Sequence, residues 1–167
     1  MTMKKISPLK LVENPFRLIG KDWTLITAEK EGKVNTMTAS WGGVGVLWKK
    51  NVVFVFVRHS RHTFGFMEAA DTFSLTFFPE DKRKMLSYCG AVSGRDEDKV
   101  AASGLTVLHE EGTPYFEEAR LAVLCRKLYA QDIAADAFAD RAILPECYGD
   151  NDFHRMYVGE ILSVLTQ

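Results

Sequence analysis

The chain has 167 residues, most simply one domain over residues 1–167, which is long enough to bury a hydrophobic core. Its 26% of charged residues nearly cancel to a net charge of −1, so no bulk attraction to nucleic acid or to an anionic membrane exists. No apolar run approaches the ~20 residues that cross a bilayer, and residues 1–15 lack the apolar core of a signal peptide. We therefore expect a cytoplasmic protein that binds neither nucleic acid nor a membrane.

The first half of the sequence predicts strands. A short strand is expected at 23–29 (WTLITAE), followed by a turn at 30–33 in which Gly32 supplies a permissive backbone conformation. The chain from Val34 onward then pairs back as a hairpin. Residues 51–58 (NVVFVFVR) carry β-branched and aromatic side chains on both faces, which indicates a strand buried on both sides or one that closes a barrel.

Two helices are expected around the next strand. Residues 60–70 have a helical composition, with Ser60 placed to cap the N-terminus. Residues 71–78 alternate polar and apolar side chains, as a strand does. A second helix is expected over 81–94, ending at one of the two glycines of that segment.

The second half returns to strands after a third helix. That helix is expected over 95–104, with acidic residues in its first turn and Gly104 as its C-terminal cap. A long strand at 119–133, a short helical excursion around 135–145 and a final strand at 153–165 follow. Because the helices interrupt the strands instead of alternating with them, the pattern predicts a mainly β fold, an antiparallel barrel.

The three cysteines are odd in number, far apart and outside any CxxC pattern: Cys89, Cys125 and Cys147. This arrangement favours reduced structural thiols and gives no reason to expect a metal site. Cys89 adjoins Gly90 in an expected helix and is also a candidate reactive thiol.

The segment 35–45 (NTMTASWGGVG) is poor core material. In a strand, one face would hold Val34, Thr36, Thr38 and Ser40. The other face would hold Asn35, Met37, Ala39 and Trp41. One face thus presents small hydroxyls, and three following glycines leave the backbone bare. A flat heterocycle with a polar rim suits this surface, but a threonine-rich solvent face that ends in a β-bulge suits the pattern equally. The glycines do not form the dinucleotide-binding fingerprint G-x-G-x-x-G, because the last glycine of that pattern is missing and no helix follows.

A second candidate, residues 58–63, leaves a hydrophobic strand and enters a helix, where backbone N–H groups are free. Its cations and hydroxyls are those of Arg58, Ser60, Arg61 and Thr63. We interpret the segment as a phosphate site, because cations at a helix N-terminus are electrostatically misplaced unless an anion joins them. The competing interpretation is a capped helix start with basic residues for solubility. His59 and His62 have no third ligand nearby, so we expect no metal.

Two further segments are weaker. In 93–99 (SGRDEDK) the three acids suit a first helical turn, whereas Lys99 is anomalous there and could reach an anionic ligand; both interpretations are open. His154 begins the last strand, where side chains often rim a pocket, although a lone histidine is most often structural.

Taken in order, these segments resemble the flavin reductase-like family of FMN-binding split barrels, which includes the flavoredoxins. The resemblance runs from about Trp23 to Val164. It rests on N-x-M-T-x-S-W at 35–41, R-x-S-x-x-T at 58–63, S-G-x-x-x-D-K at 93–99 and His…G-E-[IV] at 154–161. Each motif is weak alone, but four in the right order are specific.

The resemblance implies a Greek-key split β-barrel and a homodimer with FMN at or near its interface. The residues expected to contact the flavin ring and ribityl chain are Asn35, Thr36, Met37, Thr38, Ala39, Ser40 and Trp41. Those expected to hold the phosphate are Arg58, Ser60, Arg61 and Thr63, while His59 and Lys99 are expected to contact the cofactor as well. By the same resemblance, His154 would lie near the reacting face as a catalytic residue on the nicotinamide side.

The function implied is an NAD(P)H-dependent flavin reductase that passes hydride from NADH or NADPH to flavin N5. The chain shows no convincing carboxylate pair or nucleophile–base set, which fits a reaction that needs no side-chain acid or base. One alternative is a flavoredoxin-like carrier with a ferredoxin-like or monooxygenase redox partner; another is an FMN-binding module without turnover. The excursion between Ala134 and Tyr148 leaves the electron donor open. A barrel without cofactor would not explain the arginines beside Ser60 and Thr63.

Overall fold

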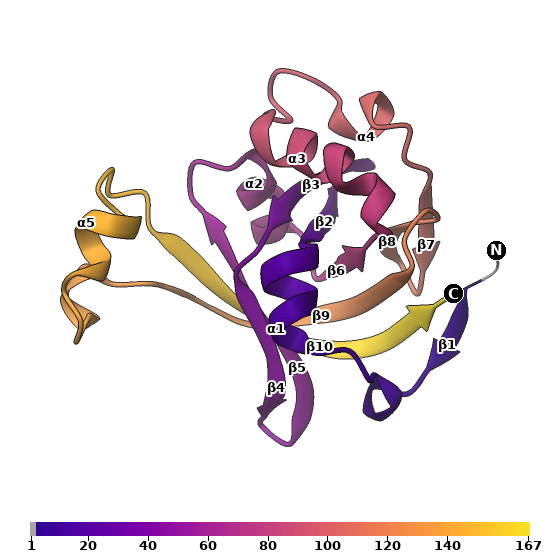
Figure 1. Cartoon of the computed structure of the whole chain (residues 1–167), viewed down its shortest axis with the longest axis horizontal. Coiled ribbons are helices and arrows are strands. Elements are labelled where there is room, and N and C mark those ends of the chain that lie inside the picture. Colours follow the sequence, from indigo (N-terminus) through magenta and orange to yellow (C-terminus); the bar gives the residue numbers. More distant parts are fainter. Residues whose placement is uncertain (1–2) are drawn as a thin grey trace.

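The computed structural model of the protein describes residues 3–167; the first two residues of the segment 1–15, where we expect no signal peptide, lie outside it. An antiparallel sheet curls into an open barrel, with α2, α3 and α4 gathered near β3 (Figure 1). The strands are β1 (Lys4–Ile6), β2 (Thr24–Lys30), β3 (Lys33–Ala39), β4 (Gly42–Leu47), β5 (Lys50–Arg58), β6 (Thr72–Phe77), β7 (Val107–Glu110), β8 (Thr113–Phe116), β9 (Leu121–Asp132) and β10 (His154–Thr166). The helices are η1 (Pro8–Lys10), α1 (Pro15–Arg17), η2 (Leu18–Asp22), α2 (His62–Ala69), η3 (Glu80–Lys82), α3 (Arg83–Ala91), α4 (Lys99–Ala102), η4 (Ala135–Ala137) and α5 (Ile143–Cys147).

The main sheet has the order β3-β2-β6-β9-β10-β5-β4, with β1 paired to β10, and β7 pairs with β8 separately. These strands confirm the mainly β barrel and the predicted hairpin, whose turn falls at Glu31 and Gly32. The long strand before the excursion and the final strand are confirmed as β9 and β10, and the second helix as α3. None of the helices among residues 3–167 is long and apolar enough to cross a membrane.

The barrel is split between β3 and β4. These strands follow each other in the chain with only Ser40 and Trp41 between them, yet they form opposite ends of the sheet order. The glycine that starts β4 is required by close packing: Gly42 has φ +155°, and a Cβ there would lie 2.8 Å from the carbonyl oxygen of Phe54. At Gly42, the absence of a side chain is therefore required by the close approach of β5, and not by a ligand.

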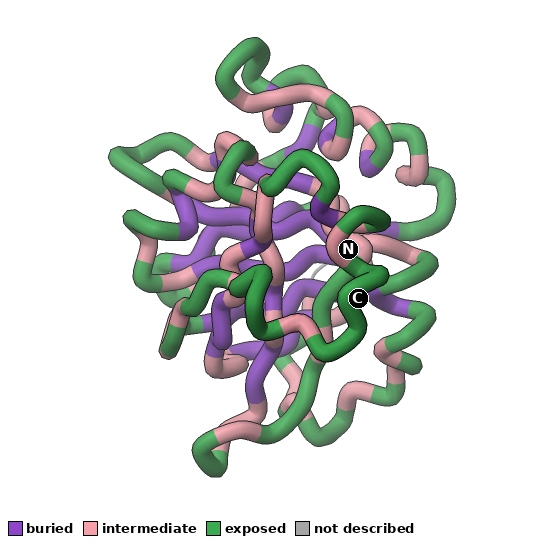
Figure 2. The backbone as a smooth tube through the Cα atoms, turned by 90° about the vertical axis from the view of Figure 1, so that its left-hand side faces the viewer, coloured by how far each residue is buried: buried purple, intermediate pink, exposed green. Residues whose placement is uncertain are grey.

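The barrel interior is filled by one face of the strands. Val53, Val55 and Val57 of β5 are buried there against Phe73 and Tyr157. On the opposite face of β5, Val52 is fully buried whereas Phe54, Phe56 and Arg58 are half-buried, so burial on both sides holds only in the first half of the strand. Figure 2 shows the buried stretches in the strands at the middle and the exposed ones in the connecting loops.

A second apolar cluster lies between the barrel and α3. Leu25 and Phe116 pack there against Leu86 and Cys89, and Cys89 is fully buried. Its Sγ lies 3.4 Å from the Ser103 hydroxyl, as in a structural thiol, and not at a surface where it could react. All three cysteines are free, and residues 3–167 contain no group of three or more side chains suited to a metal.

The polar face of β6 does not meet solvent. Ser74 and Thr76 are fully buried, and the Ser74 hydroxyl donates a hydrogen bond of 2.6 Å to the carbonyl of Pro114. Because the β7–β8 hairpin covers this face, the polar and apolar alternation of β6 does not mark an exposed side.

Two of the predicted helix starts are wrong. Helix α2 begins at His62 with Arg61 at its N-cap position, while the Ser60 hydroxyl bonds Asp152 instead of capping the helix. The expected ten-residue third helix is only the four residues of α4, and Asp98 caps it through a 3.1 Å bond from the Ala101 N–H. The acids therefore precede the helix because their side chains favour turn and cap positions.

The cap expected at Gly104 is confirmed by its φ of +65°.

Two hairpins were not predicted from the sequence. The β4–β5 turn consists of Trp48 and Lys49, both with positive φ, and contains no glycine that would signal it. The β7–β8 turn, Glu111–Gly112, carries one glycine in a polar stretch.

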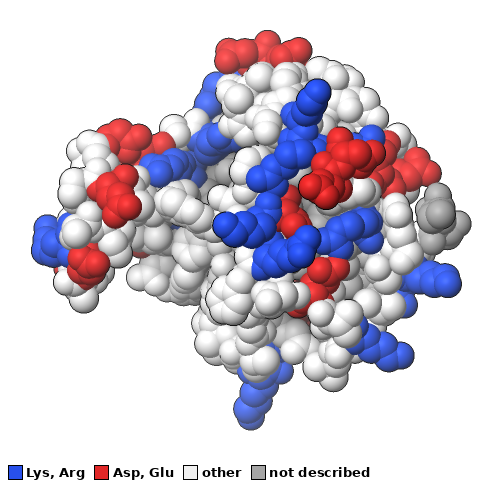
Figure 3. All heavy atoms as spheres, viewed as in Figure 1, with Lys and Arg blue, Asp and Glu red and all other residues white. Residues whose placement is uncertain are grey.

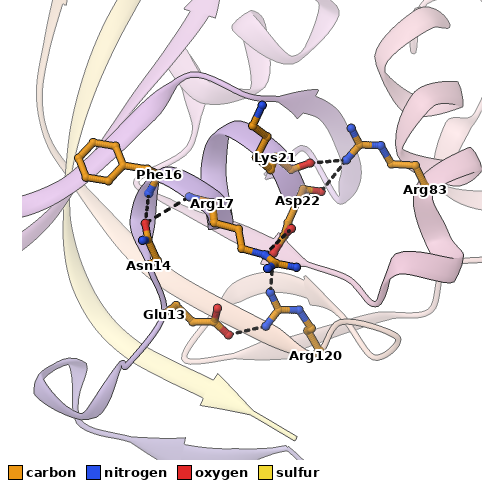
Figure 4. A network of polar contacts seen from close by, with 8 residues as sticks. All are labelled: Glu13, Asn14, Phe16, Arg17, Lys21, Asp22, Arg83 and Arg120. Atoms are coloured by element: carbon orange, nitrogen blue, oxygen red, sulfur yellow. Dashed lines mark hydrogen bonds and ion pairs between the residues drawn. The ribbon is translucent and has the colours of Figure 1, made fainter.

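Two arginines hold the N-terminal helices: Arg120 ties them to the start of β9 and Arg83 to α3 (Figure 4). Arg120 bonds Glu13 at 2.5 Å and Asp22 at 3.1 Å. Arg83 donates to the carbonyl of Lys21 at 2.5 Å, and its guanidinium lies 3.2 Å from the centroid of the Trp23 ring. Acidic and basic side chains are consequently intermingled on this face, in keeping with the small net charge (Figure 3).

Replacing Gly159 by alanine tests the packing of the barrel. A Cβ at this position of β10 would lie 2.6 Å from Cζ of the buried Phe73 ring. We expect Gly159→Ala to lower the free energy of unfolding by about 1–3 kcal/mol, because a closely packed interior resists added volume. Urea-induced unfolding followed by circular dichroism measures this change.

The matched control is Gly65→Ala in α2, where an added Cβ meets nothing within 4 Å. It should leave stability unchanged or raise it by up to about 1 kcal/mol, because alanine favours helices. Equal effects of the two substitutions would contradict the packing described at Gly159.

Candidate functional site

A surface hollow of about 220 Å³ lies at the split of the barrel. It is formed by the end of β3, the end of β5, the residue before α2 and the start of β10. Its lining residues are Met37, Thr38, Ala39, Ser40, Trp41, Phe56, Arg58, Arg61 and His154. Every one of them except Phe56 is among the predicted site residues, so the hollow unites three of the four sequence motifs.

The sheet register explains why these segments meet. His154 opens β10 directly opposite Arg58, the last residue of β5. The Trp41 ring lies 5.2 Å and the Phe56 ring 6.4 Å from the His154 ring, measured between centroids. Trp41 is 48% exposed, which is unusual for so large an apolar ring and gives the hollow an open aromatic wall.

The threonines of β3 do not form an open ladder of hydroxyls. Thr36 is fully buried, with its Oγ1 2.9 Å from Oγ1 of Thr27, and does not reach the hollow. The Thr38 hydroxyl donates to the carbonyl of Leu86 in α3 at 2.5 Å. The side chain of Ser40, the residue after β3, makes no hydrogen bond with residues 3–167. Its hydroxyl and the main chain nearby are therefore available to a ligand.

Asn35 and Thr63 lie away from the hollow. The Asn35 side-chain amide donates to the Thr63 hydroxyl at 2.8 Å, and both residues are buried. Gly94 packs on this pair so closely that a Cβ there would lie 2.3 Å from the Asn35 amide oxygen. Asn35 and Gly94 line a separate cavity of about 750 Å³, so the first motif serves two surfaces of the protein.

Two cations lie at the C-terminal end of α3: Lys99 is buried, and Arg61, which lines the hollow, is half-buried. Arg61 donates to the carbonyl of Gly90 at 2.9 Å, and Lys99 donates to the carbonyl of Cys89 at 2.9 Å. Neither has a carboxylate within ion-pair distance among residues 3–167. Only the negative end of the α3 dipole compensates them.

Their burial shows in their pKa values. Lys99 is only 2% exposed, and burial, assisted by the charge of Arg61, lowers its pKa to about 8. Burial also lowers the pKa of Arg61. A buried and a half-buried cation at one helix end, without an acid partner among residues 3–167, form an arrangement that an incoming anion would stabilise.

The other residues of the second motif contact the β9–β10 connection, residues 133–153. The Ser60 N–H donates to Asp152 Oδ1 at 3.3 Å, and the Ser60 hydroxyl donates to Oδ2. His59 lies 2.8 Å from Asp132 at the end of β9. Ser60 thus already holds an anionic group, a carboxylate, just before α2.

Arg58 fastens the same connection to the barrel. Its guanidinium donates to the carbonyl of Asp152 at 2.6 Å and to that of Cys147 at 2.9 Å. It also lies 3.6 Å from the Asp150 carboxylate and 5.1 Å from the centroid of the Tyr148 ring. The connection projects beyond the barrel in Figure 1, but its base is held at the hollow.

His154 is buried and uncharged at neutral pH. Its Nδ1 lies 2.7 Å from the Tyr148 hydroxyl, and burial, with the charge of Arg58 adding to it, lowers its pKa to about 4. Sequence reasoning missed Tyr148 and Phe56. No local pattern marks Tyr148, whereas Phe56 could have been found from its place two residues before Arg58 on the same strand face.

Comparisons with known proteins identify a family for this chain. A family model described as "Flavin reductase like domain" matches residues 16–167. No curated protein matches the chain in a sequence comparison.

Several solved structures share the fold. Flavoredoxin from Methanosarcina acetivorans has 23% identity and a TM-score of 0.69, with 98% of this chain and 75% of that chain covered. An FMN-binding protein from Thermus thermophilus, solved with 1-cyclohex-2-enone, has 22% identity and a TM-score of 0.68 over 98% of this chain and 77% of that one. An NADH:FAD oxidoreductase from Streptomyces globisporus, solved with NAD and FAD fragments, has 16% identity and a TM-score of 0.65 over 87% and 74%.

The match of the family model over residues 16–167, with the split antiparallel barrel that carries it, shows that the chain belongs to the flavin reductase-like family.

Proposed function

We propose that the protein binds FMN at the split of the barrel and is an NAD(P)H-dependent flavin reductase. The observation that carries the proposal is a pair of cations that lack an acid partner among residues 3–167: the half-buried Arg61, which lines an aromatic-walled hollow, and the buried Lys99. A phosphate supplies the missing negative charge, and a flat ring suits the open face of Trp41. The family, and the similar structures of a flavoredoxin and an FMN-binding protein, support the same class of ligand.

The residues present fit the parts of FMN. The main chain of Ser40 and Trp41 and the Ser40 hydroxyl would meet the ring edge, while Arg61 and Lys99 would meet the phosphate. Ser60 would join them once its hydrogen bonds to Asp152 are exchanged for phosphate oxygens. Bound FMN would supply the two-electron acceptor that the protein's own side chains cannot provide.

The chain's contribution to the reaction is orientation. The hollow contains no carboxylate, and its single histidine is neutral, so no side chain acts as acid or base in the hydride step. Trp41, Phe56 and His154 instead form walls that would hold two flat rings in contact.

The protein is further proposed to act as a homodimer. Small-molecule sites enclose about 300–1,000 Å³, whereas the hollow of one chain measures about 220 Å³. Apolar side chains beside it are exposed along the split and β4, including Trp41 at 48%, Val46 at 74% and Trp48 at 54%. A second copy would cover this edge strand and complete the wall of the site.

The homodimer predicts a mass of twice 18.8 kDa in analytical ultracentrifugation. Val46→Glu should shift the protein toward the monomer, because it places a charge in the proposed interface. Ala101→Glu on the exposed surface of α4 is the control and should remain dimeric. A wild-type monomer that binds FMN would contradict the dimer.

One alternative has specific support. The similar structure from Methanosarcina acetivorans is a flavoredoxin, and the β9–β10 connection is anchored next to the hollow by the contact of Tyr148 with His154. In that case a ferredoxin-like protein or a monooxygenase partner would exchange electrons with the flavin. An FMN-binding module without turnover is the remaining possibility.

An anaerobic visible spectrum distinguishes these functions. The purified protein, loaded with FMN, is expected to be yellow and to bleach when NADH or NADPH is added. Bleaching by dithionite but by neither nicotinamide would identify an electron carrier or a binding module. A colourless protein that takes up no FMN would overturn the proposed cofactor.

Lys99→Met tests the anion site. We expect the Kd for FMN to rise about 10- to 100-fold, because a hydrogen bond to a charged group contributes about 1.5–3 kcal/mol. The FMN-free variant should be more stable than the wild type by about 1–2 kcal/mol, because a buried charge is removed. FMN titration by fluorescence and urea unfolding measure the two effects.

The pH dependence adds a second readout. Since the pKa of Lys99 is lowered from 10.5 to about 8, the folded chain releases this proton before the unfolded chain does. Wild-type stability should therefore gain a contribution as the pH rises from about 8 to 10.5, and Lys99→Met should lack it. Lys33→Met, an exposed substitution at the start of β3, is the control. Unchanged FMN affinity in Lys99→Met would contradict the assignment.

A further inference from the structure

Tyr148 connects the β9–β10 connection to the wall of the candidate site. It directly follows α5, is only 5% exposed, and places its hydroxyl 2.7 Å from Nδ1 of His154. This is the single hydrogen bond of the Tyr148 hydroxyl among residues 3–167. The contact therefore determines where two protons lie, that of the phenol and that of the imidazole.

The phenol is the donor in this hydrogen bond. A buried O–H needs an acceptor, and Nδ1 is the only one that the described residues offer it. If Nδ1 carried the imidazole proton instead, the phenol proton would be left without a partner. A neutral His154 whose Nδ1 accepts from Tyr148 must hold its own proton on Nε2.

Nε2 faces the hollow. The His154 ring lines the hollow, and Nε2 makes no hydrogen bond with residues 3–167. It is also not among the fully buried polar atoms that lack a partner. The Nε2–H group is therefore open to whatever occupies the hollow.

Tyr148 is held rigidly. Its ring stacks on Phe153 at 4.6 Å with an interplanar angle of 16°, and Phe138 approaches edge-on at 5.9 Å. Arg58 lies over the same ring at 5.1 Å and bonds the carbonyl of the preceding residue, Cys147. The phenol thus has one position from which to reach His154.

We propose that Tyr148 is a positioning residue that fixes His154 as an uncharged Nε2–H donor for a carbonyl oxygen, that of a nicotinamide carboxamide. The proposal rests on the flavin reductase function proposed above. A neutral donor suits an uncharged amide oxygen, whereas an imidazolium would favour a carboxylate or a phosphate. The amide would bind beside Trp41, on the wall that His154 shares.

The surrounding charges support the neutral ring. Arg58 faces His154 from β5 and disfavours the imidazolium, while Asp152, from the β9–β10 connection, favours it. Tyr148, directly after α5, faces it and stabilises the neutral form by donating to Nδ1. Removal of the phenol hydroxyl should therefore raise the pKa of His154.

Nitrogen-15 NMR of the FMN-free protein at pH 7 tests the tautomer. His154→Asn identifies the His154 signals among the four histidines. We expect the wild-type ring to carry its proton on Nε2 and to accept at Nδ1. In Tyr148→Phe, which keeps the stacked ring, the hydrogen-bonded Nδ1 signal should disappear and both tautomers should be populated. A wild-type proton on Nδ1, or an unchanged spectrum in Tyr148→Phe, would overturn the proposal.

Tyr115→Phe is the matched control, because Tyr115 is a buried tyrosine of β8 that packs against Ala122, Leu124 and Leu165. It should leave the His154 signals unchanged. A shift of these signals in Tyr115→Phe equal to that in Tyr148→Phe would mean a general structural effect and would also overturn the proposal.

Steady-state reduction of the FMN-loaded protein tests the ligand. Tyr148→Phe should raise KM for the nicotinamide about 3- to 10-fold, since one neutral hydrogen bond is weakened, and should leave the Kd for FMN unchanged. An unchanged KM would overturn the carboxamide as the acceptor. If neither NADH nor NADPH reduces the wild type, the proposed function fails together with the carboxamide, while the NMR result still decides whether Tyr148 controls the tautomer.

Discussion

The barrel remains open because β4 pairs with β5 and not with β3, and the site at the split depends on this one choice of partner. Gly42 lets β4 approach the backbone of Phe54, which draws the chain away from β3 within two residues. The last residues of β3 consequently keep an unpaired edge. The ends of β5 and β10 lie beside that edge, so main-chain groups, aromatic rings and cations gather in one hollow.

Electrostatics at this hollow oppose stability. Arg61 and Lys99 are placed together by the end of α3, whose carbonyls compensate only part of their charge. The FMN-free protein is therefore destabilised at the position where a phosphate would bind, and the ligand would restore the missing charge. On the proposed function, the buried Lys99 would serve the binding of the phosphate and not the stability of the fold.

The β9–β10 connection adds a second layer to the site. Arg58 and Ser60, which the sequence predicts as phosphate ligands, hold this connection by hydrogen bonds to Cys147 and Asp152. Held in this way, the connection brings Tyr148 to His154 and fixes the state of a ring that the barrel alone would leave free. The β9–β10 connection, which projects from the barrel in Figure 1, thus contributes Tyr148 to the surroundings of His154 at the split.

The sequence by itself determined six of the strands (β2, β3, β5, β6, β9 and β10), their mainly antiparallel arrangement and three motifs that meet in the hollow, because side-chain periodicity and turn residues act over a few positions. It did not determine which hydroxyls are available to a ligand. Thr36, Thr38 and Ser40 follow the same alternation in the sequence, but the hydroxyls of Thr36 and Thr38 are hydrogen-bonded within the protein. It also did not reveal the Trp48–Lys49 turn, which has no glycine. Only the tertiary structure decided that Lys99 joins Arg61, that Asp152 meets Ser60 and that Tyr148 bonds His154. These contacts depend on how strands, helices and the β9–β10 connection pack against one another, and no short-range pattern records that packing.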